Sequence, residues 1–148
     1  MNDTQRLLAI QAIKTTKSRY FRFLDTKQID GLATVFAPDA EMDMRGESQD
    51  GSGLVHGNRQ IAEFILGSVT GIVTVHHGHT PEIDFTSATS ARVIWAMEDK
   101  LWKPQQSSST LQFNAMHGYG HYHETYELVG TQWLIKTMTL TRLRIDIA

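Results

Sequence analysis

The sequence predicts an α+β fold, in which about three N-terminal helices pack on a curved antiparallel sheet that forms a cone. Two observations support this prediction. The chain from Thr4 to Gln28 contains no Gly or Pro and spaces its apolar residues near 3.6 positions apart, which is typical of an amphipathic helix. From residue 72 onward, stretches rich in Val, Ile, Thr, Tyr and Trp are separated by breaks, which is typical of strands. No repeat or linker divides the chain, so residues 1–148 are expected to form a single domain.

The three predicted helices lie in the first half of the chain. The first spans about residues 4–26 after a cap at Asp3 or Thr4, and its apolar positions are Leu7, Ile10, Ile13, Tyr20 and Leu24. A second, shorter helix opens at Asp30 and stops at Pro38, with Leu32, Val35 and Phe36 on one face. After a polar loop over 45–53, Gly57 and Asn58 cap a third helix that carries Ile61, Phe64 and Ile65.

Four strands are predicted in the second half, over roughly 72–85, 89–103, 115–129 and 132–146. The breaks at 86–88 and 130–131 are short enough for hairpins, whereas 103–110 is a longer polar loop. Such a sheet encloses a cone-like pocket when it curls, and the helices close its mouth.

Composition excludes several classes of function. The net charge of -2 and the pI near 6.4 provide no bulk attraction to nucleic acid or to an anionic membrane surface. The absence of cysteine excludes disulfides, thiol nucleophiles and iron–sulfur clusters, and it fits a cytoplasmic location. We expect neither a signal peptide nor a membrane span, because the N-terminus lacks the apolar core of a signal and no run approaches about 20 apolar residues.

Asp99 is the most informative candidate site residue. In the predicted strand over 91–102 it falls on the face that also carries Val93, Trp95, Met97 and Leu101, so its side chain is expected to point toward the core. A buried carboxylate is costly unless a base or a hydrogen-bond donor pairs with it. The alternative is an aspartate at a strand end that already reaches water.

The histidines of the run His76-His77-Gly78-His79 are candidate partners, but their orientation is ambiguous. If Val73 and Val75 point inward, regular alternation selects His77 and His79. A bulge at Gly78 would instead place His76 and His79 on a common face with Ile83 and Phe85. A metal site built from these histidines is disfavoured, because no spacing typical of zinc ligands is present.

Three further residues are candidates. Tyr20 lies on the apolar stripe of the first helix, where it is either a core tyrosine or a pocket donor. Asp25 stands near the end of that helix. Arg142 shares a strand face with Leu134, Met138 and Leu140, so it is a candidate counter-ion for Asp99 or for a ligand carboxylate.

Several segments together resemble one known family. They are Arg19–Asp25, His76–Ile83, Trp95–Asp99, Gln132-Trp133 and Thr141-Arg142, and they match in order the SnoaL-like branch of the nuclear-transport-factor-like superfamily, most closely its bile-acid dehydratases. The resemblance covers nearly the whole chain except Met42–Val55 and Lys103–Phe113, which border the expected mouth of the cone.

The resemblance implies a lyase or isomerase that needs no cofactor and no metal. It places the catalytic residues on Tyr20, Asp25, His76, Asp99 and Arg142, and thereby favours His76 over His77. It also implies a homo-oligomer, a dimer or trimer. We therefore expect a dehydratase-like lyase acting on a hydrophobic alicyclic or steroid-like molecule, with His76 as general base and Tyr20 as donor to the developing oxyanion or departing group. The alternatives are an isomerase or cyclase of the same fold, or a non-catalytic carrier of hydrophobic small molecules.

Overall fold

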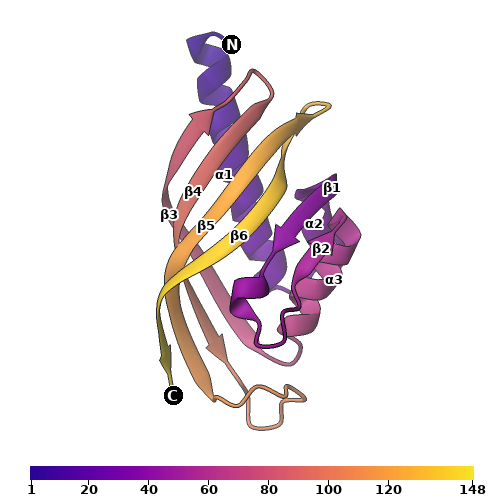
Figure 1. Ribbon diagram of the computed structural model, residues 1–148, viewed down its shortest axis with the longest axis vertical. Helices are drawn as coiled ribbons and strands as arrows, with labels where there is room; N and C mark the ends of the chain where they lie inside the picture. The colour runs from indigo at the N-terminus through magenta and orange to yellow at the C-terminus, as the bar shows by residue number, and fades with distance from the viewer.

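The computed structural model describes residues 1–148, which fold into three α-helices and one six-stranded sheet (Figure 1). The helices are α1 (Asp3–Asp25), α2 (Ile29–Thr34) and α3 (Asn58–Ser68), and a single 3₁₀ turn, η1, spans Arg45–Glu47. The strands are β1 (Phe36–Asp43), β2 (Leu54–His56), β3 (Val73–Phe85), β4 (Ser90–Trp102), β5 (Ala115–Val129) and β6 (Gln132–Ile147). The strand order in the sheet is β2-β1-β6-β5-β4-β3.

Helix α1 packs along the concave side of the sheet. Its first turn is fixed by a capping box, in which Asn2 and Gln5 each accept the backbone N–H of the other. The inward face was only partly predicted, because Ile13, Tyr20 and Leu24 are buried whereas Leu7 is 66% exposed. The reason is geometric: the N-terminal end of α1 extends beyond the strands in Figure 1, so its first turns have little sheet to pack against.

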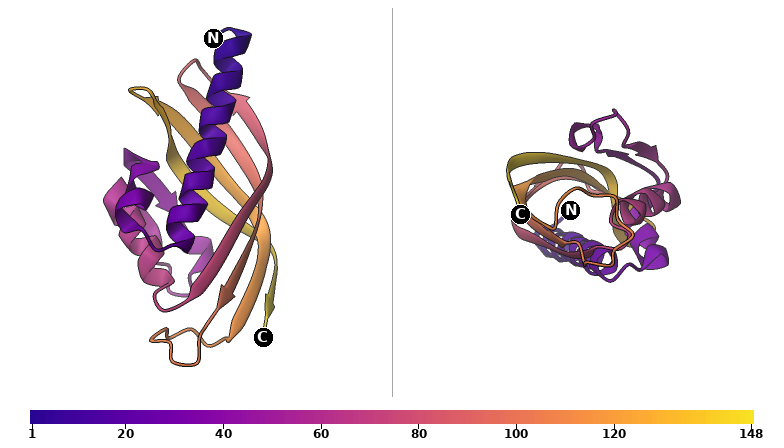
Figure 2. Two further views of the ribbon diagram at one scale, coloured as in Figure 1. Left: turned by 180° about the vertical axis from the view of Figure 1, so that it is seen from behind. Right: turned by 90° about the horizontal axis from the view of Figure 1, so that it is seen from below.

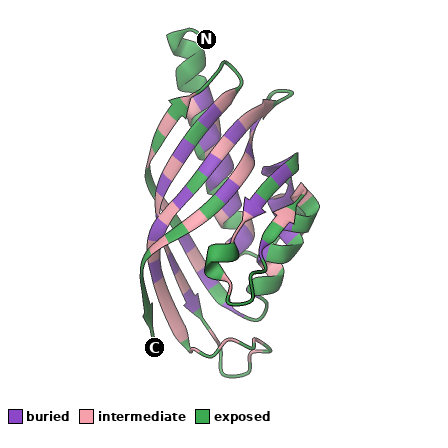
Figure 3. Ribbon diagram, viewed as in Figure 1, coloured by how far each residue is buried: buried purple, intermediate pink, exposed green.

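The four long strands match the predicted ones to within one residue at each end and pair in antiparallel order. They are strongly curved, and seen from below they form a ring with α1 (Figure 2). Buried residues alternate mainly with partly buried ones along β4 and β5, as a sheet with one covered face requires (Figure 3). The predicted α+β cone is therefore confirmed.

The first sheet edge differs from the prediction. The second helix was predicted to continue to Pro38, but residues 36–43 form β1, which runs parallel to β6 and makes the sheet mixed rather than wholly antiparallel. Helix α2 ends at Thr34 because Pro38 disfavours a continued helix. The strand tolerates Pro38 because its register with β6 shifts between Phe36 and Glu41, and Pro38 faces solvent there.

The core lies between the concave face of the sheet and the three helices. Its largest fully buried apolar side chains are Tyr20, Tyr126, Phe36, Ile13, Leu24, Leu32, Met42, Ile61, Ile135, Met138 and Val93. None of the helices combines the length and the apolar character that crossing a lipid bilayer requires.

Candidate active site

A bulge in β3 turns His76 toward the inside of the cone. Gly78 pairs with Met97 and Pro81 pairs with Trp95. His79 and Thr80 of β3 therefore stand opposite a single residue of β4, Ala96. His76 is consequently buried, with 8% of its surface exposed, whereas the side chain of His77 is 56% exposed.

The bulge at Gly78 is therefore confirmed, with Ile83 and Phe85 partly buried on the same side as His76. One detail of this prediction is wrong: His79 is exposed, because the extra residue falls on His79 and Thr80, just after Gly78. Val73 points outward while Thr74 and His76 take the inner face, so the alternative of regular alternation with Val73 inward is not observed.

Asp25, at the last position of α1, holds one side of the His76 ring. Its Oδ1 lies 2.7 Å from His76 Nδ1, and its Oδ2 accepts the backbone N–H of His76 at 2.9 Å. Thr74 donates its hydroxyl to Asp25 Oδ1 at 2.9 Å and in turn accepts from Lys27 Nζ at 2.7 Å. With these donors around it, the carboxylate is held as an acceptor, which favours a proton on Nδ1 and leaves Nε2 as the basic atom.

Asp99 lies on the other side of His76 and is buried, as its strand position predicted. It forms a bidentate ion pair with Arg142, at 2.6 Å and 2.9 Å, while its distance to His76 Nε2 is 3.9 Å. The pair requires Gly118, which stands opposite Asp99 on β5, because a Cβ there would lie 2.2 Å from Arg142 Nη1 and 2.3 Å from Asp99 Oδ1.

A second carboxylate, that of Glu47, reaches the same guanidinium from outside the sheet. Its Oε2 lies 2.8 Å from Arg142 Nε, and it comes from η1, in the segment that connects β1 to β2. Burial alone would lower the pKa of Arg142, but the hydrogen bonds and charges of Asp99 and Glu47 raise it. Sequence reasoning missed Glu47, because the polar loop that carries it has no periodicity to indicate which way its side chains point.

Two tyrosines supply hydroxyl groups beside this charged cluster. Tyr20 from α1 and Tyr122 from β5 are both buried, and their rings meet edge to face with centroids 6.0 Å apart. Burial is the main reason that the pKa of each phenol is raised above its ordinary value, so both hydroxyls stay protonated and can donate. Tyr122 was not predicted as a site residue, although it lies on the inner face of its strand.

A fully buried ion pair lies next to the two tyrosines. Lys17 Nζ contacts Glu124 and sits over the rings of Tyr20 and Tyr122, at 4.1 Å and 3.6 Å from their centroids. Glu124 also accepts the hydroxyl of Tyr126 at 2.8 Å. Burial lowers the pKa of Lys17 to about 8, against the opposing effect of Glu124. Lys17 was not predicted as a site residue. Its position three residues before Tyr20, on the buried face of α1, was the signal in the sequence that could have indicated its burial.

These groups border a cavity of about 360 Å³ that is otherwise largely apolar. The apolar lining comes from all parts of the chain and includes Leu24, Met42, Met44, Phe64, Ile65, Val69, Leu101, Leu111, Phe113, Met116 and Leu140. The predicted residues Tyr20, His76, Asp99 and Arg142 all line it, and Asp25 stands directly behind His76. The structure thus brings the five predicted site residues together.

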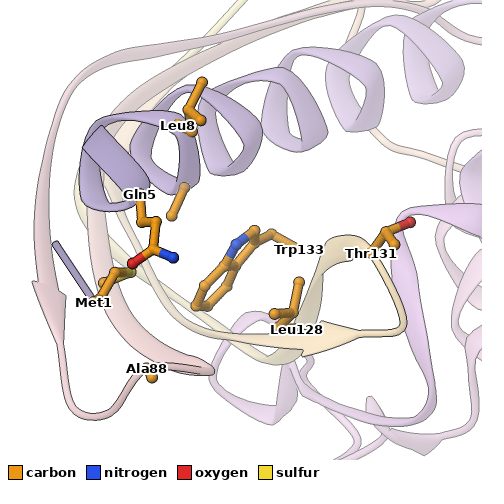
Figure 4. Close-up of a pocket in the computed structure, with 8 residues that line it drawn as sticks. Met1, Gln5, Leu8, Ala88, Leu128, Thr131 and Trp133 are labelled. Atoms are coloured by element: carbon orange, nitrogen blue, oxygen red, sulfur yellow. The ribbon is translucent and has the colours of Figure 1, made fainter. Parts of the chain in front are cut away.

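A second cavity, of about 500 Å³, lies at the opposite end of the sheet, between the start of α1 and the two hairpin turns (Figure 4). It is larger, but its lining carries no ionisable side chain, as the residues Met1, Gln5, Leu8, Ala9, Ala88, Leu128, Thr131 and Trp133 show. Of these two cavities, only the one at His76 is lined by side chains that can exchange protons with a ligand.

Comparisons with known proteins agree with this architecture. The model of the SnoaL-like domain family matches residues 5–139. The "Probable cyclase FGR4" of Gibberella zeae is 24% identical in an alignment 145 residues long that covers 91% of this chain and 91% of its own.

Two solved structures share the fold. The "Putative Scytalone Dehydratase" of Novosphingobium aromaticivorans has a TM-score of 0.81 at 21% identity and covers 99% of this chain and 92% of its own. The hexachlorocyclohexane dehydrochlorinase LinA-type3 of Novosphingobium barchaimii has a TM-score of 0.80 at 18% identity, covering 99% and 94%. Since the family model spans nearly the whole chain, this protein belongs to the SnoaL-like domain family.

Proposed function

We propose that this protein is a cofactor-independent lyase that removes water, or another small leaving group, from a hydrophobic alicyclic or steroid-like molecule. The observation that carries the proposal is the Asp25–His76 pair at the wall of an apolar cavity. Asp25 occupies Nδ1, so the lone pair of Nε2 is available to a ligand. A positioned imidazole is efficient as a base at neutral pH because its ordinary pKa is near 6.5.

The proposed reaction begins with transfer of a C–H proton from the substrate to His76 Nε2. The electron pair of that bond forms a carbon–carbon double bond, and the bond to the leaving group on the neighbouring carbon breaks. Asp99, 3.9 Å from Nε2, stabilises the imidazolium that results. Tyr20 and Tyr122 donate hydrogen bonds to the departing oxygen or to a carbonyl that becomes an enolate. When the leaving group is hydroxide, the imidazolium returns the proton to it and water departs.

An isomerase or cyclase is the second candidate. The curated relative in Gibberella zeae is called a probable cyclase, and double-bond migration or ring closure can start from the same proton transfer to His76. Mass balance separates the lyase from the other two outcomes: a lyase loses a leaving group, whereas an isomerase or cyclase conserves the mass of its substrate.

The test is a screen of alicyclic and steroid alcohols, ketones and halides, followed by mass spectrometry. The proposal expects loss of water or hydrogen halide from at least one of them. His76→Ala should reduce that turnover by about 10²–10⁴-fold. His77→Ala is the matched control, because it removes the same side chain one residue away on the outer face. Equal activity of the two variants would contradict a base at position 76, and binding without turnover in the wild type would favour a carrier.

A further inference from the structure

Arg142 is the only lysine or arginine that lines the cavity at His76. A guanidinium in a largely apolar cavity is ordinarily a receptor for a carboxylate or phosphate, because its fork of N–H groups matches two acceptor oxygens. In this protein, however, the fork already has partners from the protein itself.

Two carboxylates accept hydrogen bonds from the guanidinium. Asp99 accepts from Nη1 and Nη2 at 2.6 Å and 2.9 Å, and Glu47 accepts from Nε at 2.8 Å. The side chain of Arg142 is 16% exposed, so little of it remains free to meet a ligand. Because two negative charges face one positive charge, the group formed by Asp99, Glu47 and Arg142 has a net negative charge.

The remaining polar groups suit an uncharged ligand. The hydroxyls of Tyr20 and Tyr122 can donate to a carbonyl or hydroxyl oxygen, and the rest of the lining is mainly aliphatic, aromatic or thioether. A carboxylate or sulfate in this space would lose its hydration and meet the carboxylates of Asp99 and Glu47, whose two negative charges the single charge of Arg142 only partly balances.

Building on the proposed function, we infer that the substrate is uncharged in the part that enters the cavity, and that Glu47 is a specificity-determining residue that excludes anions by occupying Arg142 Nε and adding a second negative charge beside Asp99. Glu47 reaches the site from a connecting segment and not from the cone itself. Its removal would free Arg142 Nε and leave a guanidinium able to receive an anionic ligand.

Binding of two nearly isosteric probes tests this inference. 2-Acetylnaphthalene is neutral, whereas 2-naphthoate has the same ring system and carries a carboxylate. Calorimetric titration of the wild type should show the ketone binding at least ~10-fold more tightly, and this preference should shrink at least ~10-fold in Glu47→Gln. Glu63→Gln is the matched control, because it removes an equal charge from the exposed face of α3, where Glu63 pairs with Arg59, and it should keep the wild-type preference.

Glu47→Ala provides a second variant in case the glutamine variant folds poorly, and a melting curve accompanies each titration. A wild type that binds naphthoate as tightly as the ketone, or that binds no ketone, overturns the inference. An unchanged preference in both Glu47 variants also overturns it. Because neither probe has to react, these results stand apart from the turnover screen, and a failure of the lyase proposal is recognised separately.

Discussion

Gly118→Ala is expected to destabilise the protein by disrupting the Asp99–Arg142 ion pair. The new Cβ would lie 2.2 Å from Arg142 Nη1 and 2.3 Å from Asp99 Oδ1, whereas ordinary van der Waals contact begins at 3.4 Å. Both groups would therefore have to move by about 1 Å, and the bidentate geometry does not survive such a shift. Overpacking of this kind costs typically 1–3 kcal/mol, so we expect a loss of about 2 kcal/mol.

The assay is thermal and urea denaturation followed by circular dichroism. For a chain of this length, about 2 kcal/mol corresponds to a fall in Tm of roughly 4–8 °C. Gly46→Ala is the matched control, since no atom lies within 4 Å of a Cβ placed there and the backbone is not left-handed, so its Tm should match the wild type.

A double-mutant cycle with Asp99→Ala separates the steric effect from other causes. Without the Asp99 carboxylate, one of the two obstacles is gone, so the added cost of the alanine at position 118 should fall. If Gly118→Ala has the same Tm as the wild type, a Cβ at position 118 does not displace the ion pair, which contradicts the predicted steric clash.

Further predictions concern the groups around the tyrosines and Asp25. Thr74→Val removes the hydroxyl that donates to Asp25 and should lower the free energy of unfolding by about 1–3 kcal/mol in urea denaturation. Thr74→Ser should restore most of this loss, and an equal loss in both variants would contradict a hydrogen-bonding role. Lys17→Met leaves Glu124 buried without its cation and should cost about 3–5 kcal/mol, whereas the double variant Lys17→Met/Glu124→Leu should recover much of it; equal instability of the two would contradict this pairing. Burial raises the pKa of Tyr20, Tyr122 and Tyr126 above 10, so only the unfolded chain releases these protons near pH 10. Their contribution to stability should therefore be present below pH 10 and decline above it. A series of urea denaturations whose midpoint rises as the pH passes through that range would contradict this prediction.

Long, regular patterns made much of the fold predictable. The first helix and the four long strands extend over 13 or more residues each, and their boundaries were close because many positions repeat the same period. Strand β1 was not predicted, because it has only 8 residues, contains Pro38, and does not alternate strictly between buried and exposed positions. Its parallel pairing with β6 depends on contacts between distant segments that no local period reveals.

The site was predictable where strand parity decides orientation. The inward position of Asp99 follows from alternation along β4, whereas alternation along β3 left a regular strand and a bulge at Gly78 both open, and the family resemblance favoured the bulge. The outward turn of His79 could not be predicted, because the position of the extra residue within the bulge depends on pairing with β4. Glu47 and Lys17 were missed because their partners come from distant parts of the chain.

The tautomer of His76 tests its proposed role as a base most directly, and two-dimensional ¹H–¹⁵N NMR of the imidazole measures it at a pH where the ring is neutral. We expect a protonated Nδ1, which donates to Asp25 at 2.7 Å, and an unprotonated Nε2 facing the cavity, since 3.9 Å to Asp99 is too long for a hydrogen bond. In Asp25→Asn this preference should weaken. A neutral His76 that carries its proton on Nε2 in the wild type would have no free base directed at the ligand, and that result would contradict the central claim.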